Sequence, residues 1–408
     1  MTSHQTSDLR VLVAQIGSRR AYAVPRILHQ AGLLEHLVTD LALEVVPFQP
    51  LRDLLGGKSW RMHGLPSDKV SCFPLFGLHR AIMNRLSCRP GPRLRAYTRW
   101  NRRFCRLVVD RSFGGENLVY TYNCAGLEIL QHAKARACGT VMDQTAAPWA
   151  TEEPLIDEER ALWPGWEYAG ATRADWRELA EREEREWALA DVIVCGSEYV
   201  VDCLRRLSGP ADKCAVVPYG VEEGLFAHRV RNRRDEPLRV LSVGTAQLRK
   251  GVQYLMEAAR LLARDRFVFR WVGPVRVSPQ AVAELSAAIE LAGPVPRSAL
   301  QNVYDWADVL VLPSLSEGSA NVCYEALACG LPVVTTPNAG SVVRDGIDGF
   351  VVPIRSPEGI AARLLELASN SDRLERMSRN TTERVPEFTW TAYAQRLLTA
   401  IGANRFVT

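Results

Sequence analysis

The chain is most constrained over residues 307–353, which read ADVLVLPSLSEGSANVCYEALACGLPVVTTPNAGSVVRDGIDGFVVP. The apolar run 309–312 has the length and composition of a strand buried on both faces. A proline and a polar, glycine-containing loop follow it. Apolar residues then recur at helical spacing over 321–329, and residues 333–336 read as a second short strand. This order predicts one strand–loop–helix–strand unit of a parallel α/β sheet.

Two glutamates occupy distinctive places in this unit. Glu317 lies in the loop just before the predicted helix, and Glu325 lies inside the helix. The start of a helix at the carboxyl end of a parallel strand favours an anion, because free N–H groups and the helix dipole point at it. A carboxylate at the same place suits hydroxyl groups, so we expect a ligand with both phosphate and polyol. The alternative is a carboxylate that stabilises the helix start and a second one at the surface.

Length and composition set broad bounds. A chain of 408 residues is long for one core, so two domains are expected. Its ten cysteines are single, without a CxxC pair or a His/Cys cluster at metal spacing, which predicts a reducing cytoplasm and no metal site. Residues 1–10 are polar, unlike a signal peptide, and no apolar run is long enough to span a bilayer.

Positive charge is concentrated in residues 52–111, with fourteen Lys/Arg against three Asp/Glu. Within this region a helix is predicted over residues 90–112. Its apolar face is formed by Tyr97, Trp100, Phe104, Leu107 and Val108, and its basic face by Arg95, Arg99, Arg102 and Arg106. One interpretation is a core-facing helix with a solvated basic side. The other is a surface for an anionic acceptor or an anionic membrane; nucleic acid is not expected, since no recognised binding module accompanies the charge.

The segment Glu317-GSANVCY-Glu325, set between PSLSEG and EALACGLPVV, resembles the donor-site signature of glycosyltransferase family 4. The resemblance is strong from residue 192 to the end and moderate over 10–32 and 118–145. It implies the α/β GT-B fold, in which two Rossmann-like doubly wound domains face a cleft. We expect an acceptor-side domain over residues 1–217, a donor domain over 218–388, and a final helix over 389–408 that crosses back onto the first domain.

The resemblance also implies site residues. Lys250 matches the lysine of the family's KG pair, and Arg249 stands in for an arginine that more often follows the VG dipeptide, where this chain has Thr245. Both are expected to neutralise the departing nucleoside diphosphate. The alternative is that Arg249 and Lys250 are only surface residues of this loop. Gly17 takes the place of the glycine loop after the first strand, where Arg19 and Arg20 add charge; a plain turn is the other interpretation. The remaining implied donor contacts are Glu317 for the sugar hydroxyls, Glu325 for the ribose, and the loop and helix start at Gly318, Ser319, Ala320, Asn321 and Val322.

On the acceptor side the predicted strand 140–142 leaves residues 143–145 at its carboxyl end. Family members often carry a histidine in this part, and residues 143–149 contain none. Asp143 is therefore the candidate there, with a polar strand end that caps the next element as the alternative. The catalytic set expected from the resemblance is Glu317, Lys250 and Asp143.

The resemblance implies a retaining, metal-independent transfer of a sugar from a nucleotide-sugar donor to an acceptor hydroxyl, without a cofactor. Polysaccharide or glycolipid synthesis is the expected setting, with an anionic lipid-linked or glycan acceptor. Peripheral contact with the inner face of the membrane rests on the basic helix alone. Two alternatives are a catalytically silent nucleotide-sugar-binding protein and a GT-B nucleotide-sugar epimerase.

Overall fold

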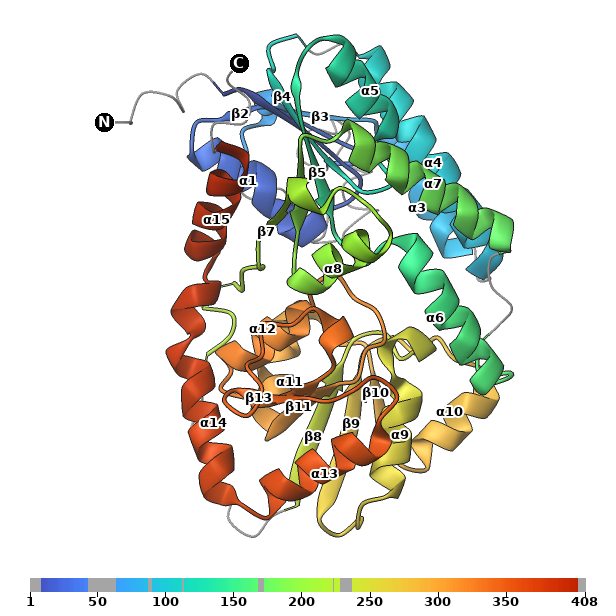
Figure 1. Cartoon of the computed structure of the whole chain (residues 1–408), viewed down its shortest axis with the longest axis vertical. Helices are drawn as coiled ribbons and strands as arrows, with labels where there is room; N and C mark the ends of the chain where they lie inside the picture. The colour runs from blue at the N-terminus through green and yellow to red at the C-terminus, as the bar shows by residue number, and fades with distance from the viewer. Residues whose placement is uncertain are drawn as a thin grey trace, which may run out of the picture.

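The computed structural model describes residues 9–42, 64–86, 90–111, 114–167, 172–222, 224–227 and 237–402. Two parallel sheets with helices on their faces lie one above the other (Figure 1). The described strands of the first sheet are ordered β3-β2-β1-β4-β5-β6-β7, and those of the second β10-β9-β8-β11-β12-β13. In each, the order of strands reverses direction beside the first strand, as the predicted doubly wound topology requires. We call each sheet with its helices a domain.

The first domain is built from strands whose apolar runs are buried on both faces. Its strands are β1 (Val11–Gln15), β2 (Leu34–Thr39), β3 (Val70–Cys72), β4 (Leu118–Tyr122), β5 (Gly139–Gln144), β6 (Val192–Cys195) and β7 (Cys214–Val216). Its helices are α1 (Ala23–Gln30), α3 (Pro74–Leu86), α4 (Pro90–Asp110), α5 (Leu127–Ala135), α6 (Trp149–Leu162), α7 (Arg173–Leu189) and α8 (Glu198–Arg206). The sequence did not predict β2, β3 or α3. For residues 41–70 it suggests loops with brief helices, and residues 43–63 of that segment lie outside the described residues.

The second domain contains the unit that opened the sequence analysis. β11 (Val309–Leu312), α12 (Asn321–Ala328) and β12 (Val333–Thr335) follow one another as predicted, and β11 pairs with β12 in parallel. The other strands are β8 (Leu238–Val243), β9 (Phe267–Val272), β10 (Glu290–Gly293) and β13 (Gly349–Val351). The other helices are α9 (Val252–Arg260), α10 (Pro279–Ser286), α11 (Leu300–Trp306), α13 (Pro357–Ala368) and α14 (Ser371–Glu383), with the 3₁₀ turn η6 (Leu248–Lys250) before α9.

Helix α6 leaves the first domain and packs on η6, the turn before α9, and its lower end in Figure 1 lies close to α10. The carboxylate of Glu159, fully buried, accepts hydrogen bonds from Gln253 and Tyr254 at 2.7 and 2.9 Å and from Arg355 at 2.5 Å. Trp166, just after the helix, is buried in the core of the second domain. The segment around α6 is therefore a second link between the domains, besides the chain crossing.

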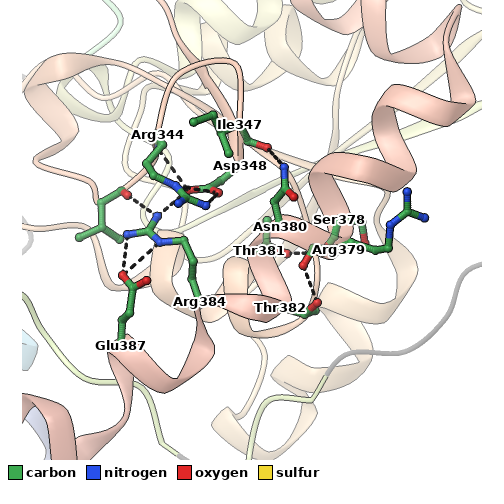
Figure 2. A network of polar contacts seen from close by, with 11 residues as sticks. Arg344, Ile347, Asp348, Ser378, Arg379, Asn380, Thr381, Thr382, Arg384 and Glu387 are labelled. Atoms are coloured by element: carbon green, nitrogen blue, oxygen red, sulfur yellow. Dashed lines mark hydrogen bonds and ion pairs between the residues drawn. The ribbon is translucent and has the colours of Figure 1, made fainter.

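The chain returns to the first domain through α14 and α15 (Trp390–Gly402), and α15 packs against α1. The turn before α15 is anchored by Asp348, a fully buried carboxylate that binds Arg344 and Arg384 (Figure 2). Arg384 also donates to the carbonyl oxygen of Val342 at 2.9 Å and to Glu387 at 3.1 Å. This network ties the loop between β12 and β13 to the segment that leads into α15.

Candidate functional site

A cavity of about 560 Å³ lies between the two domains. Loops that follow β1, β4 and β5 form one wall, while η6, the loop after β11 and the start of α12 form the other. Both walls are carboxyl ends of parallel strands, where open α/β sheets bind ligands. The lining residues are Arg19, Arg20, Asn123, Thr145, Ala146, Ala147, Trp149, Glu152, Tyr219, Arg249, Lys250, Glu317, Gly318, Ser319, Ala320, Asn321 and Val322.

The second-domain wall is centred on two cations and one carboxylate. Lys250 forms an ion pair with Oε1 of Glu317, and Nη1 of Arg249 lies 3.4 Å from Oε2 of the same residue. The guanidinium of Arg249 also donates to the carbonyl oxygen of Ser316 at 2.5 Å. Gly251 follows with a φ of +72°, and a Cβ there would lie 2.0 Å from the carbonyl oxygen of Pro313, so only glycine fits this turn. The tight turn places both cations against the loop that carries Glu317.

Glu317 is held as an anion. Burial alone would raise the pKa of its carboxyl group, but Lys250 and then Arg249 bring the pKa below its usual value. The hydroxyl of Ser314 also donates to Oε1 at 3.1 Å. A carboxylate fixed in this way accepts hydrogen bonds from hydroxyl groups at neutral pH.

The start of α12 supplies backbone donors to the same wall. Asn321 and Val322 are the first two residues of the helix and line the cavity, and the first N–H groups of a helix have no partner within it. Ala320 differs from the prediction, because its N–H donates to the carbonyl oxygen of Ala339 at 3.2 Å. The N–H groups that this helix start offers to the cavity are therefore those of Asn321 and Val322.

Gly318 brings the two walls together. A Cβ at this position would lie 2.0 Å from the carbonyl oxygen of Thr145 in the first domain. The carbonyl oxygen of Gly318 accepts a hydrogen bond from Ser197 at 2.5 Å. Ser197 stands at the N-cap position of α8, but its side chain does not cap the helix and instead bridges the domains. Glycine is required here by the close approach of the two domains.

The first-domain wall carries Arg20 in an unusual backbone. Arg20, Ala21 and Tyr22 have φ values of 46°, 51° and 61°, a left-handed conformation that costs a non-glycine residue about 1–2 kcal/mol. The guanidinium of Arg20 binds both oxygens of Asp143 at 2.9 and 3.1 Å. It also donates to the hydroxyl of Tyr393 in α15 at 2.8 Å. Such strain persists only where surrounding contacts fix the conformation, and these contacts aim Arg20 at the cavity.

Asp143 itself lies outside the cavity lining. The strand β5 extends through Gln144, so Asp143 is inside the strand rather than beyond its end, and it is fully buried. Besides Arg20, it accepts a hydrogen bond from the hydroxyl of Tyr120 at 2.8 Å. Burial alone would lower the pKa of Arg20, but Asp143 raises it well above its ordinary value. In this arrangement Asp143 positions Arg20.

Two predicted donor contacts also lie outside the lining of this cavity. The carboxylate of Glu325 accepts a hydrogen bond from Tyr304 at 2.6 Å and lies 3.8 Å from Arg297, and burial raises its pKa. The N–H of Gly17 donates to Oδ1 of Asp40 at 2.7 Å. The structure thus brings Lys250, Arg249 and the 317–322 loop together, whereas Gly17 and Glu325 have other partners.

Several lining residues carried no signal in the sequence. Glu152 in α6 accepts a hydrogen bond from Ser316 at 3.1 Å and lies 3.8 Å from Nε of Arg249, and burial raises its pKa. Asn123 accepts from the hydroxyl of Thr145 at 2.8 Å. These residues are polar positions in loops or on an acidic helix, and only the docking of the two domains places them at one cavity.

Residues 237–370 match the family model described as Glycosyl transferases group 1. This segment contains both halves of the second-domain wall, Lys250 and Glu317. It belongs to the group 1 glycosyltransferases. The match to the model confirms the predicted family for residues 237–370.

Curated relatives match parts of this chain. This chain is 32% identical over 200 residues to the putative colanic acid biosynthesis glycosyltransferase WcaL of Salmonella typhimurium. The aligned residues cover 45% of this chain and 49% of that protein. This chain is also 30% identical over 259 residues to D-inositol 3-phosphate glycosyltransferase of Thermobispora bispora, 54% of this chain and 60% of that protein. The chain spans about half the length of the curated relatives it matches.

Solved structures establish the fold. Sucrose-phosphate synthase from Thermosynechococcus elongatus superposes with a TM-score of 0.68 at 18% identity, over 95% of this chain and 97% of that one. Anabaena HepE, solved in complex with UDP-glucose, superposes with a TM-score of 0.63 at 14% identity, over 97% of this chain and 100% of that one. The chain therefore has the predicted GT-B fold. Among the described residues no helix is both long and apolar enough to cross a membrane.

Behind the first-domain wall lies a buried carboxylate network on α7, a helix whose Glu/Arg pairs at helical spacing predict a solvated face from the sequence alone. Glu183 and Glu186 are fully buried. Glu183 accepts hydrogen bonds from Asn123 at 2.9 Å and from the backbone N–H of Trp149 at 2.8 Å, so it holds two residues of the cavity wall. Glu186 accepts from three backbone N–H groups, those of Cys124, Gly126 and Leu127. The prediction of a solvated face failed because Glu and Arg at helical spacing look the same on a buried helix face.

This network predicts a pH dependence of stability. Burial raises the pKa of Glu183 to about 7 and that of Glu186 to about 8. In the unfolded chain both groups titrate near about 4.3, so the folded protein binds more protons between that pH and about 8. We therefore expect the free energy of unfolding to fall as pH rises from about 5 to about 8. The slope of this free energy against pH corresponds to a difference of up to two bound protons between the folded and the unfolded chain. Urea unfolding across this range measures the slope.

The matched comparison is the double variant Glu183→Gln/Glu186→Gln. It is expected to be less stable at pH 6, because each amide offers an N–H where a side-chain oxygen of the glutamate accepts a hydrogen bond. Its slope between pH 6 and 8 is expected to be flatter. A double variant with the slope of the parent chain would show that other groups govern the pH dependence.

Proposed function

We propose that this chain is a retaining glycosyltransferase that moves a sugar from a nucleotide-sugar donor to an acceptor hydroxyl. One observation carries the proposal: a single interdomain cavity brings together Lys250, Arg249, Glu317 and the start of α12. The family of residues 237–370 supports it. The solved complexes of HepE with UDP and with UDP-glucose support a nucleotide-sugar as the donor.

In this proposal the diphosphate lies between Lys250 and the N–H groups of Asn321 and Val322. Negative charge develops on the departing diphosphate, so cations and fixed backbone donors stabilise the transition state more than the ground state. Lys250 has three N–H donors, which allows it to bind a phosphate oxygen while it keeps one contact with Glu317. Arg249 adds a second cation to this wall.

Glu317 would accept hydrogen bonds from the sugar hydroxyls beside the reacting carbon. The acceptor would enter from the first-domain wall, where Asn123, Thr145 and Trp149 lie. Glu325 stays the proposed ribose contact, and a ribose there would have to exchange hydrogen bonds with Tyr304. Closure of both walls around the ligands would exclude water and limit hydrolysis of the donor.

We further propose that the reaction needs no metal ion. Four cations line the cavity, namely Arg19, Arg20, Arg249 and Lys250, while Glu152 and Glu317 are the carboxylates in that lining. Arg20 already pairs with Asp143 behind the lining, so one positive charge is left over to neutralise the diphosphate. Polysaccharide synthesis is the proposed pathway class, because the relatives WcaL and AmsK are described by colanic acid and amylovoran biosynthesis.

The test is turnover by the full chain with a panel of UDP-, GDP- and ADP-sugars, measured as release of nucleoside diphosphate with and without a sugar acceptor. We expect one donor to be consumed at a rate that rises at least tenfold with acceptor, with the anomeric configuration retained in the product and with the rate unchanged in EDTA. Conversion of the donor sugar without acceptor would identify an epimerase instead. Tight binding of a nucleotide-sugar, without turnover for any combination of donor and acceptor, would identify a catalytically silent binding protein.

A further inference from the structure

We propose that the outer faces of α3 and α4 dock on a membrane surface that carries anionic lipid. The α3–α4 face consists of Leu75, Ile82 and Met83 on α3 and of Arg99, Arg103 and Arg106 on α4. Docking by this face does not depend on the proposed function; only its use to reach a membrane-held acceptor does.

The apolar half of this face is concentrated on one helix. Leu75, Ile82 and Met83 are 86%, 47% and 39% exposed, and their spacing of seven and one residues puts them on the same side of α3. The other large apolar side chains with comparable exposure are Leu162, Leu261, Val268, Val275, Ile347 and Leu365, which lie singly on different segments. Single exposed apolar residues are ordinary, whereas a cluster on one helix face marks an interaction site.

The basic half lies on α4, which packs beside α3 along one flank of the first domain (Figure 1). Trp100 packs on Phe76 of α3 at 5.6 Å between ring centres, while Arg95 and Arg102 form ion pairs with α7. The exposed side chains of Arg99, Arg103 and Arg106 occupy the arc between these two contacts. These three arginines form no ion pair with any described residue.

The two halves form one continuous surface. His79 lies on the exposed side of α3 between Leu75 and Ile82, and its ring meets that of Trp100 in α4 at 5.0 Å. Helical spacing then places Arg103, three residues after Trp100, beside this contact. The apolar side chains of α3 and the arginines of α4 therefore face the same side of the domain.

An anionic lipid surface is the occupant that uses both halves. Apolar side chains enter the boundary between headgroups and acyl chains, and arginines bind the anionic headgroups at the same level. A nucleic acid or an acidic protein would engage the arginines but would leave three apolar side chains in water. Fourteen Lys/Arg against three Asp/Glu in residues 52–111 give this region the charge that an anionic surface attracts.

The inner side of α4 reaches the cavity. Tyr97 of α4 packs on Trp149, a lining residue, at 6.3 Å between ring centres. One helix thus borders the cavity wall on its inner side and presents arginines on its outer side. A docked chain would hold the acceptor wall close to the lipid headgroups, so an acceptor attached to a lipid could enter without leaving the membrane.

The experiment is co-sedimentation of the full chain with vesicles of phosphatidylcholine alone and with about 30% phosphatidylglycerol, without donor or acceptor. We expect at least tenfold stronger binding to the anionic vesicles, lost at about 0.5 M salt because ions screen the contact. The variant Arg99→Gln/Arg103→Gln/Arg106→Gln is expected to bind about a hundredfold more weakly. The variant Leu75→Ser/Ile82→Ser/Met83→Ser is expected to bind at least tenfold more weakly.

Matched controls come from the second domain. Two triple variants there remove either three exposed arginines or three exposed apolar side chains, and both should leave vesicle binding unchanged. They are Arg260→Gln/Arg264→Gln/Arg376→Gln and Leu261→Ser/Ile347→Ser/Leu365→Ser. An unchanged melting temperature checks that each variant is folded. Equal binding to both kinds of vesicle, or equal binding by the α3–α4 variants and their controls, would overturn the proposal. A dimer that depends on Leu75 and Ile82, with no vesicle binding, would overturn it in favour of a second copy of the chain.

Discussion

Replacement of Lys250 by alanine is expected to lower kcat/KM for the donor by about 10²–10³, the usual effect of removing one charged donor that stabilises a transition state. The reason is local, because the change removes the cation nearest to Glu317 and leaves that partly buried carboxylate facing the diphosphate of the proposed donor. The affinity for free nucleoside diphosphate should also fall, by at least tenfold. Steady-state turnover gives the first quantity and isothermal titration calorimetry the second.

The matched control is Lys134→Ala. Lys134 also pairs with a carboxylate, that of Asp191, but at an exposed site outside the cavity lining. Its replacement should leave both nucleotide affinity and turnover unchanged, since exposed ion pairs contribute little to stability. Nucleotide affinity that is the same in Lys250→Ala as in the parent chain would refute the assignment of the phosphate site.

Replacement of Asp143 by asparagine is expected to destabilise the protein by about 3–5 kcal/mol, because it leaves the guanidinium of Arg20 buried without its charged partner. The side chain of Arg20 is 9% exposed and that of Asp143 is fully buried, so water cannot replace the lost contact. Arg20 would also lose its fixed direction into the cavity, so turnover should fall even where the variant is folded. Urea unfolding measures the free energy, and turnover at low temperature measures the second effect.

A double-mutant cycle separates the ion pair from other effects of the change. In an Arg20→Met background, Asp143→Asn should lower the free energy of unfolding much less than it does in the parent chain, because no unpaired cation is left behind. The exposed pair of Asp202 and Arg205 provides the surface comparison, and Asp202→Asn should change stability by less than about 0.5 kcal/mol. Equal costs of Asp143→Asn with and without Arg20 would show that the pair does not support this wall.

The sequence analysis located the second-domain wall well. The strand–loop–helix–strand unit at β11, α12 and β12 was predicted within about one residue at each boundary, and Lys250 lies beside Glu317. These features are local: apolar periodicity defines strands and helices, while glycines mark the turns that bring their ends to the sheet edge. The loop at Glu317 also carries a specific motif, so its neighbours in space follow from the fold that the motif implies.

The first-domain wall could not be predicted in the same way. Arg20 acts together with Asp143 and with Tyr393, which is 373 residues away in the sequence. The buried Glu183 has the same helical spacing as an exposed glutamate. Whether a polar side chain is solvated or buried depends on which segment packs over it, and α6 and α15 cover this region from distant parts of the chain.

The sequence by itself determined the α/β class, the order of strands and helices around the second-domain wall, and the choice of Lys250 and Glu317 as candidate residues of that wall. Only the tertiary structure decided that Arg20, Glu152 and Trp149 face the same cavity, that Asp143 and Glu183 support it from behind, and that Glu325 has Tyr304 as its partner. The physical reason is that backbone periodicity is set by neighbouring residues, whereas burial and ion pairing are set by contacts between segments that meet only when both domains have folded.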